Sequence, residues 1–366
     1  MQKIPPMLLP RDGRFGSGPA RIRPQAVDSL AKAATSILGT SHRQPPVRGL
    51  VASVQAGLRE LYALPDDYEV VLGNGGASQF WDIAVFSLIA ERSSHGVFGE
   101  FTGKFAKAAA APHLDAPLIH ETAPGGVALP TPSDAADVQA WAHNETSTGA
   151  MAPVTRIHET ALTLIDGTSA AGAAVVDPTQ FDVYYFAPQK AFASDGGLWF
   201  ALCSPAAIER AEQIAGTGRW IPASLSFLDA VTNSRKNQTV NTPALATLWL
   251  MREQIRWVLD NGGLSFAEQR ARENTDQVYA WADAHEHATP FVAPEHRSTV
   301  VATIDFDDTI DAAALAATLR DNGVVDVEPY RKLGRNQLRF GLFPAVEPAD
   351  VHRLLDCVDW LLTHPK

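Results

Sequence analysis

Short apolar runs alternate with helical stretches between residues 69 and 203, and this alternation restricts the fold more than any other feature of the sequence. The apolar runs have the length of buried strands, and helical patterns such as 78–92 and 102–111 separate them. Parallel strands need long crossovers, usually helices, so this order predicts an α/β fold with a mainly parallel seven-stranded sheet and helices on both faces. The expected strands are 69–72, 96–98, 116–120, 138–143, 162–166, 183–186 and 198–203.

Helical patterns extend on both sides of this region. Apolar positions three and four apart predict helices over 24–38 and 50–62 before the strands. After the strands, a long pattern over 242–261 ends at Gly262-Gly263 and continues over 265–284.

The hydrophobic pattern in the last part of the chain differs from that of residues 69–203. Strands and helices alternate there, but without a series of short buried strands typical of a parallel sheet. The pattern predicts strands over 299–306 and 337–343 and helices over 312–322 and 348–362, which is a smaller α+β unit. We therefore expect an N-terminal arm over 1–15, a large domain over 16–263 and a small C-terminal domain over 264–366.

Charge and cysteine content exclude several classes of protein. The 41 acidic and 30 basic side chains give a net charge of −11, which opposes binding to nucleic acid or to an anionic membrane. Cys203 and Cys357 form neither a CxxC pair nor a disulfide framework, and the N-terminus does not have the pattern of a signal peptide. The longest apolar helical stretch, 80–90, is too short to span a bilayer. We expect a cytoplasmic protein.

Polar residues follow several of the predicted strands, at the sheet edge where α/β proteins bind ligands. A glycine-rich loop, 73–78, precedes a helix; Asp166 ends one strand and Lys190 follows another. Each feature alone is weak, because such a loop is often a plain turn, such an Asp a helix cap and such a Lys a solvated charge. In this order they match pyridoxal phosphate (PLP) chemistry, which needs a Schiff-base lysine, a carboxylate at the pyridine nitrogen and a helix N-terminus for the phosphate.

These features are part of a larger set of motifs spread along the chain. The motifs are Phe15-Gly16-Ser17-Gly18-Pro19, Ser41-His42-Arg43, Gly75-Gly76 with Gln79-Phe80, Asn144-Glu145-Thr146, Asp166, Gln189-Lys190 and Asn241-Thr242-Pro243. With them the sequence resembles, over nearly its whole length, the phosphoserine aminotransferases, class V aminotransferases that belong to the fold type I PLP enzymes. The resemblance implies PLP as the cofactor and a homodimer whose active sites are shared across the interface.

The resemblance also implies roles around the cofactor ring. Lys190 would form the Schiff base and Asp166 would pair with the pyridinium nitrogen. Thr146 would donate a hydrogen bond to the phenolic oxygen, and Phe101 would cover the ring where the family usually has Trp. Because Phe offers a smaller face than Trp, this difference concerns cofactor affinity and not the type of reaction.

The cofactor phosphate would be bound by residues of two subunits. Gly76, Ala77 and Gln189 are the implied contacts from the subunit that carries the lysine. Asn241 and Thr242 would reach the same phosphate from the other subunit.

Substrate binding requires basic residues for a phosphate and for carboxylates. By resemblance, His42 and Arg43 would reach across the dimer to the substrate phosphate, and Arg331 would make a second contact with the phosphate or a side-chain carboxylate. Arg339, between apolar neighbours on a predicted strand, would bind the α-carboxylate. The family commonly has His before the arginine at position 331, where this chain has Tyr330.

The implied activity is ping-pong amino transfer from glutamate to 3-phosphohydroxypyruvate, and 3-hydroxy-2-oxo-4-phosphobutanoate is a further candidate substrate. The alternatives are another class V aminotransferase of the alanine or serine–glyoxylate type, or a non-catalytic cofactor-binding homologue. The cysteines do not suit a desulfurase, because neither lies in an exposed loop of the predicted fold. Trp81 and Trp141 are expected in the core, and the histidine spacing predicts no metal site.

Overall fold

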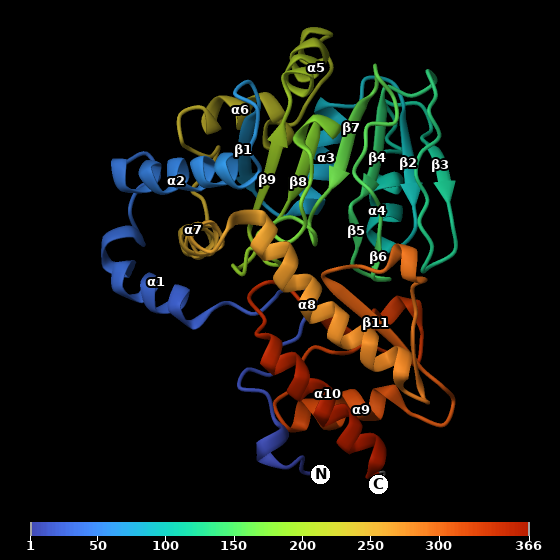
Figure 1. Cartoon of the computed structure of the whole chain (residues 1–366). Coiled ribbons are helices and arrows are strands. Elements are labelled where there is room, and N and C mark those ends of the chain that lie inside the picture. The colour runs from blue at the N-terminus through green and yellow to red at the C-terminus, as the bar shows by residue number, and fades with distance from the viewer. Residues whose placement is uncertain (1, 365–366) are drawn as a thin grey trace.

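The computed structural model describes residues 2–364 and contains the predicted α/β layers, with a seven-stranded sheet at one end of the molecule and a smaller unit at the other (Figure 1). Strands β8, β7, β4, β2 and β3 run parallel to one another, whereas β9 runs antiparallel to both of its neighbours. The mainly parallel sheet is therefore confirmed. In order across the sheet, the strands are β1 (Glu69–Asn74), β9 (Leu198–Cys203), β8 (Val183–Phe186), β7 (Leu162–Asp166), β4 (Val138–Ala142), β2 (Ser93–Val97) and β3 (Leu118–Glu121).

Helices cover both faces of this sheet, and the strand residues alternate between the two layers. Val70 and Leu72 of β1 pack in one hydrophobic cluster, whereas Val71 packs in the other. One layer contains α2 (Pro45–Leu61) and α7 (Leu245–Asp260). The opposite layer contains α3 (Ala77–Ser87), α4 (Glu100–Ala108), α5 (Pro205–Gly216) and α6 (Phe227–Ser234).

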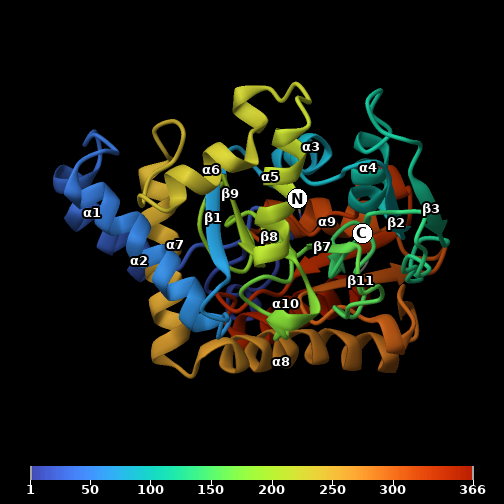
Figure 2. The same cartoon turned by 90° about the horizontal axis from the view of Figure 1, so that it is seen from above.

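The smaller unit has its own core. Its three-stranded antiparallel sheet consists of β10 (Ala288–Pro290), β11 (Val301–Phe306) and β12 (Gln337–Gly341). Against it pack α8 (Gly263–Ala284), α9 (Ala312–Asp321) and α10 (Pro348–Thr363). Seen from above, α8 runs as one long helix along an edge of the molecule, from the side of α2 and α7 toward the side of β3 (Figure 2). The domain boundaries stated above remain predictions.

The N-terminal arm packs on the smaller unit, although the sheet of the large unit follows it in the sequence. Ile4 and Phe15 belong to the core of the smaller unit, and both chain ends lie beside it in Figure 1. The chain then passes to α1 (Pro24–Ile37) and α2. Among the described residues, no helix has the length and apolar character that crossing a membrane requires.

Two differences from the sequence expectations have simple causes. Helix α2 begins at Pro45 and not near residue 50, because Pro45 and Pro46 occupy the first helical turn, where no N–H group is needed. Strand β10 was not predicted, since it has three residues and ends in Pro290. The remaining strands are the short pair β5 (Asn144–Glu145) and β6 (Ala150–Met151).

Candidate active site

The ends of β4, β7 and β8 meet residues of the smaller unit at a cavity of about 480 Å³. From the large unit come Asp166 and Lys190, and from the smaller unit come Tyr330 and Arg339. The cavity therefore lies where the two units face each other, beyond the carboxyl ends of the parallel strands. Eight of the predicted site residues line it: Gly76, Ala77, Phe101, Thr146, Asp166, Gln189, Lys190 and Arg339.

Lys190 is a buried amine at the centre of this arrangement. Its Nζ donates a hydrogen bond of 2.7 Å to Oγ1 of Thr146 and lies 5.4 Å from the centre of the Phe101 ring. Burial lowers the pKa of Lys190 to about 8, although the charges of Asp166 and Glu145 act in the opposite direction. A lysine with such a pKa supplies a useful fraction of neutral amine near neutral pH, so it can act as a nucleophile and as a base.

Asp166 ends β7 and is buried in the same cavity. Its Oδ1 accepts the backbone N–H of Thr168 at 2.9 Å. Burial raises the pKa of Asp166, and the backbone hydrogen bond from Thr168 opposes this shift only in part. A cationic group placed beside this carboxylate would favour its ionised form, so the site is suited to a protonated ring nitrogen.

Trp81 has a second role besides the core position that the sequence predicted. It is buried on α3, where its Nε1 donates to the hydroxyl of Tyr185 at 3.0 Å, but it also lines the cavity. Trp141 is buried in the core, as expected. The sequence could have indicated that Trp81, unlike Trp141, lies near the site. Trp81 is one helical turn after Ala77, at the start of the helix that follows the glycine loop.

The N-terminus of α3 forms one end of the cavity. Gly75 has φ +115°, a conformation that favours glycine, and Gly76 caps the helix without a side chain. The first N–H groups of a helix have no partner within it, so those at Ala77 and Ser78 are available to an anion. In the same cavity, Oε1 of Gln189 and Oγ1 of Thr168 are buried without a hydrogen-bond partner within the described residues. The helix N–H groups and the Thr168 hydroxyl are donors that fit an anion such as a phosphate, whereas the amide oxygen of Gln189 can only accept a hydrogen bond.

Glu145 connects this cavity to helix α4. Its buried carboxylate accepts the backbone N–H groups of Phe101 at 3.0 Å and Thr102 at 2.9 Å, and the hydroxyl of Ser147 at 2.7 Å. A carboxylate at a helix N-terminus satisfies free donors and interacts favourably with the helix dipole. Glu145, which the motif Asn144-Glu145-Thr146 contains without an assigned role, therefore fixes the start of α4 and with it the Phe101 ring.

Replacement of Glu145 by Gln is expected to destabilise the protein by about 1–3 kcal/mol, because the new amide group would direct its own hydrogens at donors that need an acceptor. Denaturant unfolding would measure the change. Glu121→Gln, at the exposed end of β3, is the matched control and is expected to stay within about 0.5 kcal/mol of the parent. Equal stability of the two variants would contradict the capping role.

Arg339 brings a positive charge from β12 to the cavity. Its Nη1 donates to the backbone oxygen of Thr146 at 3.1 Å, and its guanidinium carbon lies 5.5 Å from the centre of the Tyr330 ring. Burial lowers its pKa, although an arginine remains protonated. Its Nε is a buried donor without a hydrogen-bond partner within the described residues.

Five predicted site residues lie outside this cavity in the single chain. They are His42, Arg43, Asn241, Thr242 and Arg331. Nδ1 of His42 lies 3.2 Å from Oγ1 of Thr242, and Nδ2 of Asn74 donates to the backbone oxygen of Thr242 at 2.9 Å. The two segments expected to act across a dimer are thus next to each other. Arg331 is exposed beside Tyr330. The roles of all five remain predictions.

One further contact was not assigned from the sequence. Gly18 has φ +140°, and a Cβ added there would lie 2.8 Å from Cε of Lys190. Ser17, Gly18 and Pro19 also line the cavity. The only sequence signal was the Gly-Ser-Gly-Pro motif, which indicates a special backbone but not its partner.

Comparison with known proteins supports this description of the fold. The model of the family described as Aminotransferase class-V matches residues 131–327. A phosphoserine aminotransferase from Cytophaga hutchinsonii superposes with a TM-score of 0.89 at 21% identity, covering 95% of this chain and 99% of the other. An alanine–glyoxylate aminotransferase from Nostoc sp. superposes with a TM-score of 0.81 at 20% identity, covering 99% and 98%. The fold and the lysine-centred cavity thus define an aminotransferase of class V.

Sequence relatives identify the family within class V. The chain is 56% identical to a phosphoserine aminotransferase from Nocardioides sp., over 99% of this chain and 98% of the relative. It is 54% identical to one from Rhodococcus jostii, over 98% of each. The chain belongs to the phosphoserine aminotransferase family.

Proposed function

We propose that this protein is a PLP-dependent enzyme that transfers the amino group of glutamate to 3-phosphohydroxypyruvate, giving O-phosphoserine and 2-oxoglutarate. The observation that carries the proposal is the meeting of Lys190, Asp166 and Arg339 in one cavity, in a chain whose relatives are named phosphoserine aminotransferases. The same site would accept 3-hydroxy-2-oxo-4-phosphobutanoate if its phosphate reached the same basic residues. We propose a cytoplasmic homodimer with shared sites as the working form.

The residues of the large unit would hold the cofactor and move one proton. Bound PLP supplies an electron sink for the bond to be broken at the substrate's α-carbon. Lys190 would anchor the cofactor and, once released, carry the proton from that carbon, for which its lowered pKa and the hydrogen bond to Thr146 prepare it. Asp166 would keep a proton on the ring nitrogen.

Other groups would bind and orient the cofactor. The N-terminus of α3 at Gly76 and Ala77, with Gln189, would hold its phosphate. Asn241 and Thr242 would reach the same phosphate from the partner subunit. Phe101 would pack on one face of the cofactor ring. Glu145 holds Phe101 in place through the backbone of α4.

Substrate binding would use charges from both units. Arg339 would pair with the α-carboxylate, since the residue lines the cavity and its Nε has no partner within the described residues. His42 and Arg43 would bind the substrate phosphate from the second subunit, and Arg331 would bind the same phosphate or the second carboxylate of glutamate. Two substrates that share only the α-carboxylate would then fit one site.

The experiment is a coupled assay with glutamate as donor and a panel of keto acids with and without a phosphate. A phosphate that meets a charged partner is worth at least about 2 kcal/mol, so we expect kcat/KM for 3-phosphohydroxypyruvate to exceed that for hydroxypyruvate by about 30-fold or more. Equal or faster turnover of glyoxylate or pyruvate would favour the alternative class V activity. A protein that binds PLP without amino transfer to any acceptor would favour the non-catalytic alternative.

A further inference from the structure

The predicted N-terminal arm, 1–15, continues into residues 16–21, and the whole stretch is called the arm from here on. Its residues Ser17, Gly18 and Pro19 line the cavity beside Lys190. The backbone at Gly18 packs on the side chain of Lys190, where the position of a Cβ would be 2.8 Å from Cε and 3.3 Å from Cγ. Two residues further along the chain, the N–H of Ala20 donates to the backbone oxygen of Gln189 at 2.8 Å. The segment 17–20 thus touches both the reactive side chain and the residue before it.

The arm is also attached to the smaller unit, just before residues 17–20. The N–H of Gly341, at the end of β12, donates to the oxygen of Phe15 at 2.7 Å. The approach is close, because a Cβ at Gly341 would lie 2.2 Å from the oxygen of Gly16. The segment therefore spans the two units, and its position depends on what holds it against the smaller one.

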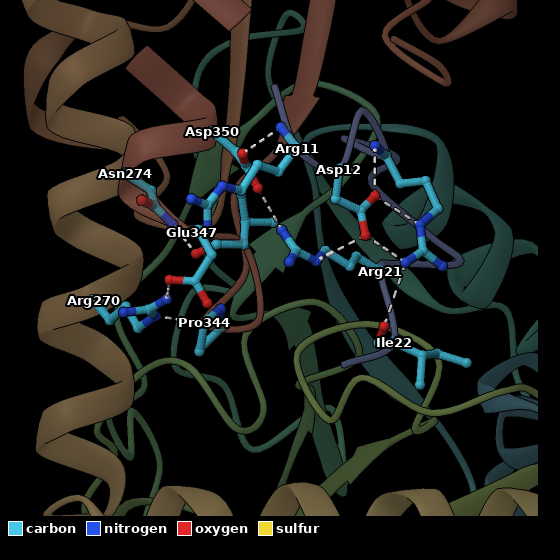
Figure 3. Close-up of polar contacts among 11 residues, drawn as sticks. Arg11, Asp12, Arg21, Ile22, Arg270, Asn274, Pro344, Glu347 and Asp350 are labelled. Carbon is cyan, nitrogen blue, oxygen red and sulfur yellow. Dashed lines mark hydrogen bonds and ion pairs between the residues drawn. The ribbon is translucent and has the colours of Figure 1, made fainter. Parts of the chain in front are cut away.

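Buried charges supply that attachment. Figure 3 shows the carboxylate of Asp350, in the first turn of α10, facing both Arg11 and Arg21. Asp350 accepts the backbone N–H of Arg11 at 2.8 Å and pairs with Nη1 of Arg21 at 2.9 Å. Arg21 also pairs through Nε with Asp12 at 3.1 Å. Both ends of the segment 11–21 thus meet at one carboxylate.

The burial of these groups separates this cluster from ordinary surface ion pairs. The side chains of Arg21 and Asp350 are 9% and 3% exposed. A buried charge that loses its partner is left uncompensated, so removing one member has a far larger effect than at the surface. Arg21 is next to Ala20 in the chain, so its two ion pairs restrain the backbone beside the segment that packs on Lys190.

We propose that Asp350 and Arg21 are positioning residues for Lys190: their ion pair holds segment 17–20 against the lysine side chain and so fixes the amine for proton transfer. Neither residue touches the cavity, and both act through the arm. The effect on turnover rests on the amino-transfer function proposed above, whereas the effect on the arm does not.

The test uses the full-length, PLP-loaded protein with the substitution Asp350→Asn, which keeps the shape and removes the charge. Hydrogen exchange at the Ala20 amide is expected to become about tenfold faster or more, because its bond to Gln189 opens more often. We expect kcat to fall about 10- to 100-fold with KM for glutamate within about twofold, because a reacting group misplaced by about 1 Å slows chemistry without weakening substrate binding.

The matched control is Glu347→Gln, which breaks the neighbouring ion pair with Arg270 but leaves the arm untouched (Figure 3). Both readouts are expected to stay at parent values. If Asp350→Asn does not fold, Gly18→Ala provides the second variant, because it disturbs the contact with Lys190 and leaves the ion pair in place. It is expected to lower kcat by a similar factor.

The outcomes separate this proposal from the proposed function. Parent kcat in folded Asp350→Asn, or in Gly18→Ala, would overturn the positioning role. A lower melting temperature with unchanged kcat and unchanged exchange at Ala20 would also overturn it, since it would show a purely structural ion pair. If the parent protein transferred no amino group, the function would fail while the exchange comparison still tested how the arm is held.

Discussion

Replacement of Lys190 by alanine is expected to lower kcat for amino transfer by at least about 10²- to 10⁴-fold, the usual contribution of a positioned acid–base group. The loss should be at the upper end, because the same amine would also anchor the cofactor. The purified variant is expected to lack the visible absorbance of lysine-bound PLP and to resist borohydride fixation of the cofactor. Steady-state kinetics and the absorption spectrum measure both effects.

Lys107→Ala is the matched control, since Lys107 is an exposed lysine in the last turn of α4. It should retain parent kinetics and parent absorbance. A Lys190→Ala protein that remained yellow, with the cofactor fixed to a different lysine on reduction, would show that Lys190 is not the reactive amine.

Replacement of Arg43 by alanine is expected to lower kcat/KM for 3-phosphohydroxypyruvate by roughly 30-fold or more, because a charge-assisted contact to the phosphate would be lost in a shielded site. PLP binding should change little. In the single chain Arg43 is exposed and lies outside the cavity, so this result requires that the residue act from a second copy.

Mixing the Lys190→Ala variant with the impaired Arg43→Ala variant tests directly whether Arg43 acts from a second copy. In a dimer of one Lys190→Ala chain and one Arg43→Ala chain, one shared site carries both substitutions and the other carries neither. Random exchange of subunits would therefore restore about a quarter of the parent activity. If Arg43 acted within its own chain, or if the protein did not form dimers, the mixture would remain inactive.

The sequence was informative about the cavity wherever a polar residue of its lining followed a strand. Asp166 and Lys190 were found this way because strand ends converge at one edge of a parallel sheet. The positioning proposal depends on Gly18 and Asp350, which the sequence did not single out because nothing in their local pattern indicates their partners. Trp81 was assigned to the core alone, since apolar periodicity identifies a buried face but not whether a cavity borders it.

For the fold, too, some features follow from the local sequence and others only from the tertiary structure. The sequence by itself determined the seven strands of the large sheet, the long helices and their alternation, because buried runs and helical periodicity are local properties of the chain. Only the tertiary structure decided that β9 enters the sheet reversed between β1 and β8, since a short connection after Lys190 allows an antiparallel neighbour. It alone also brought Arg339 to Thr146 and the arm to Lys190, because contacts between distant segments depend on how separate layers pack and not on any local pattern.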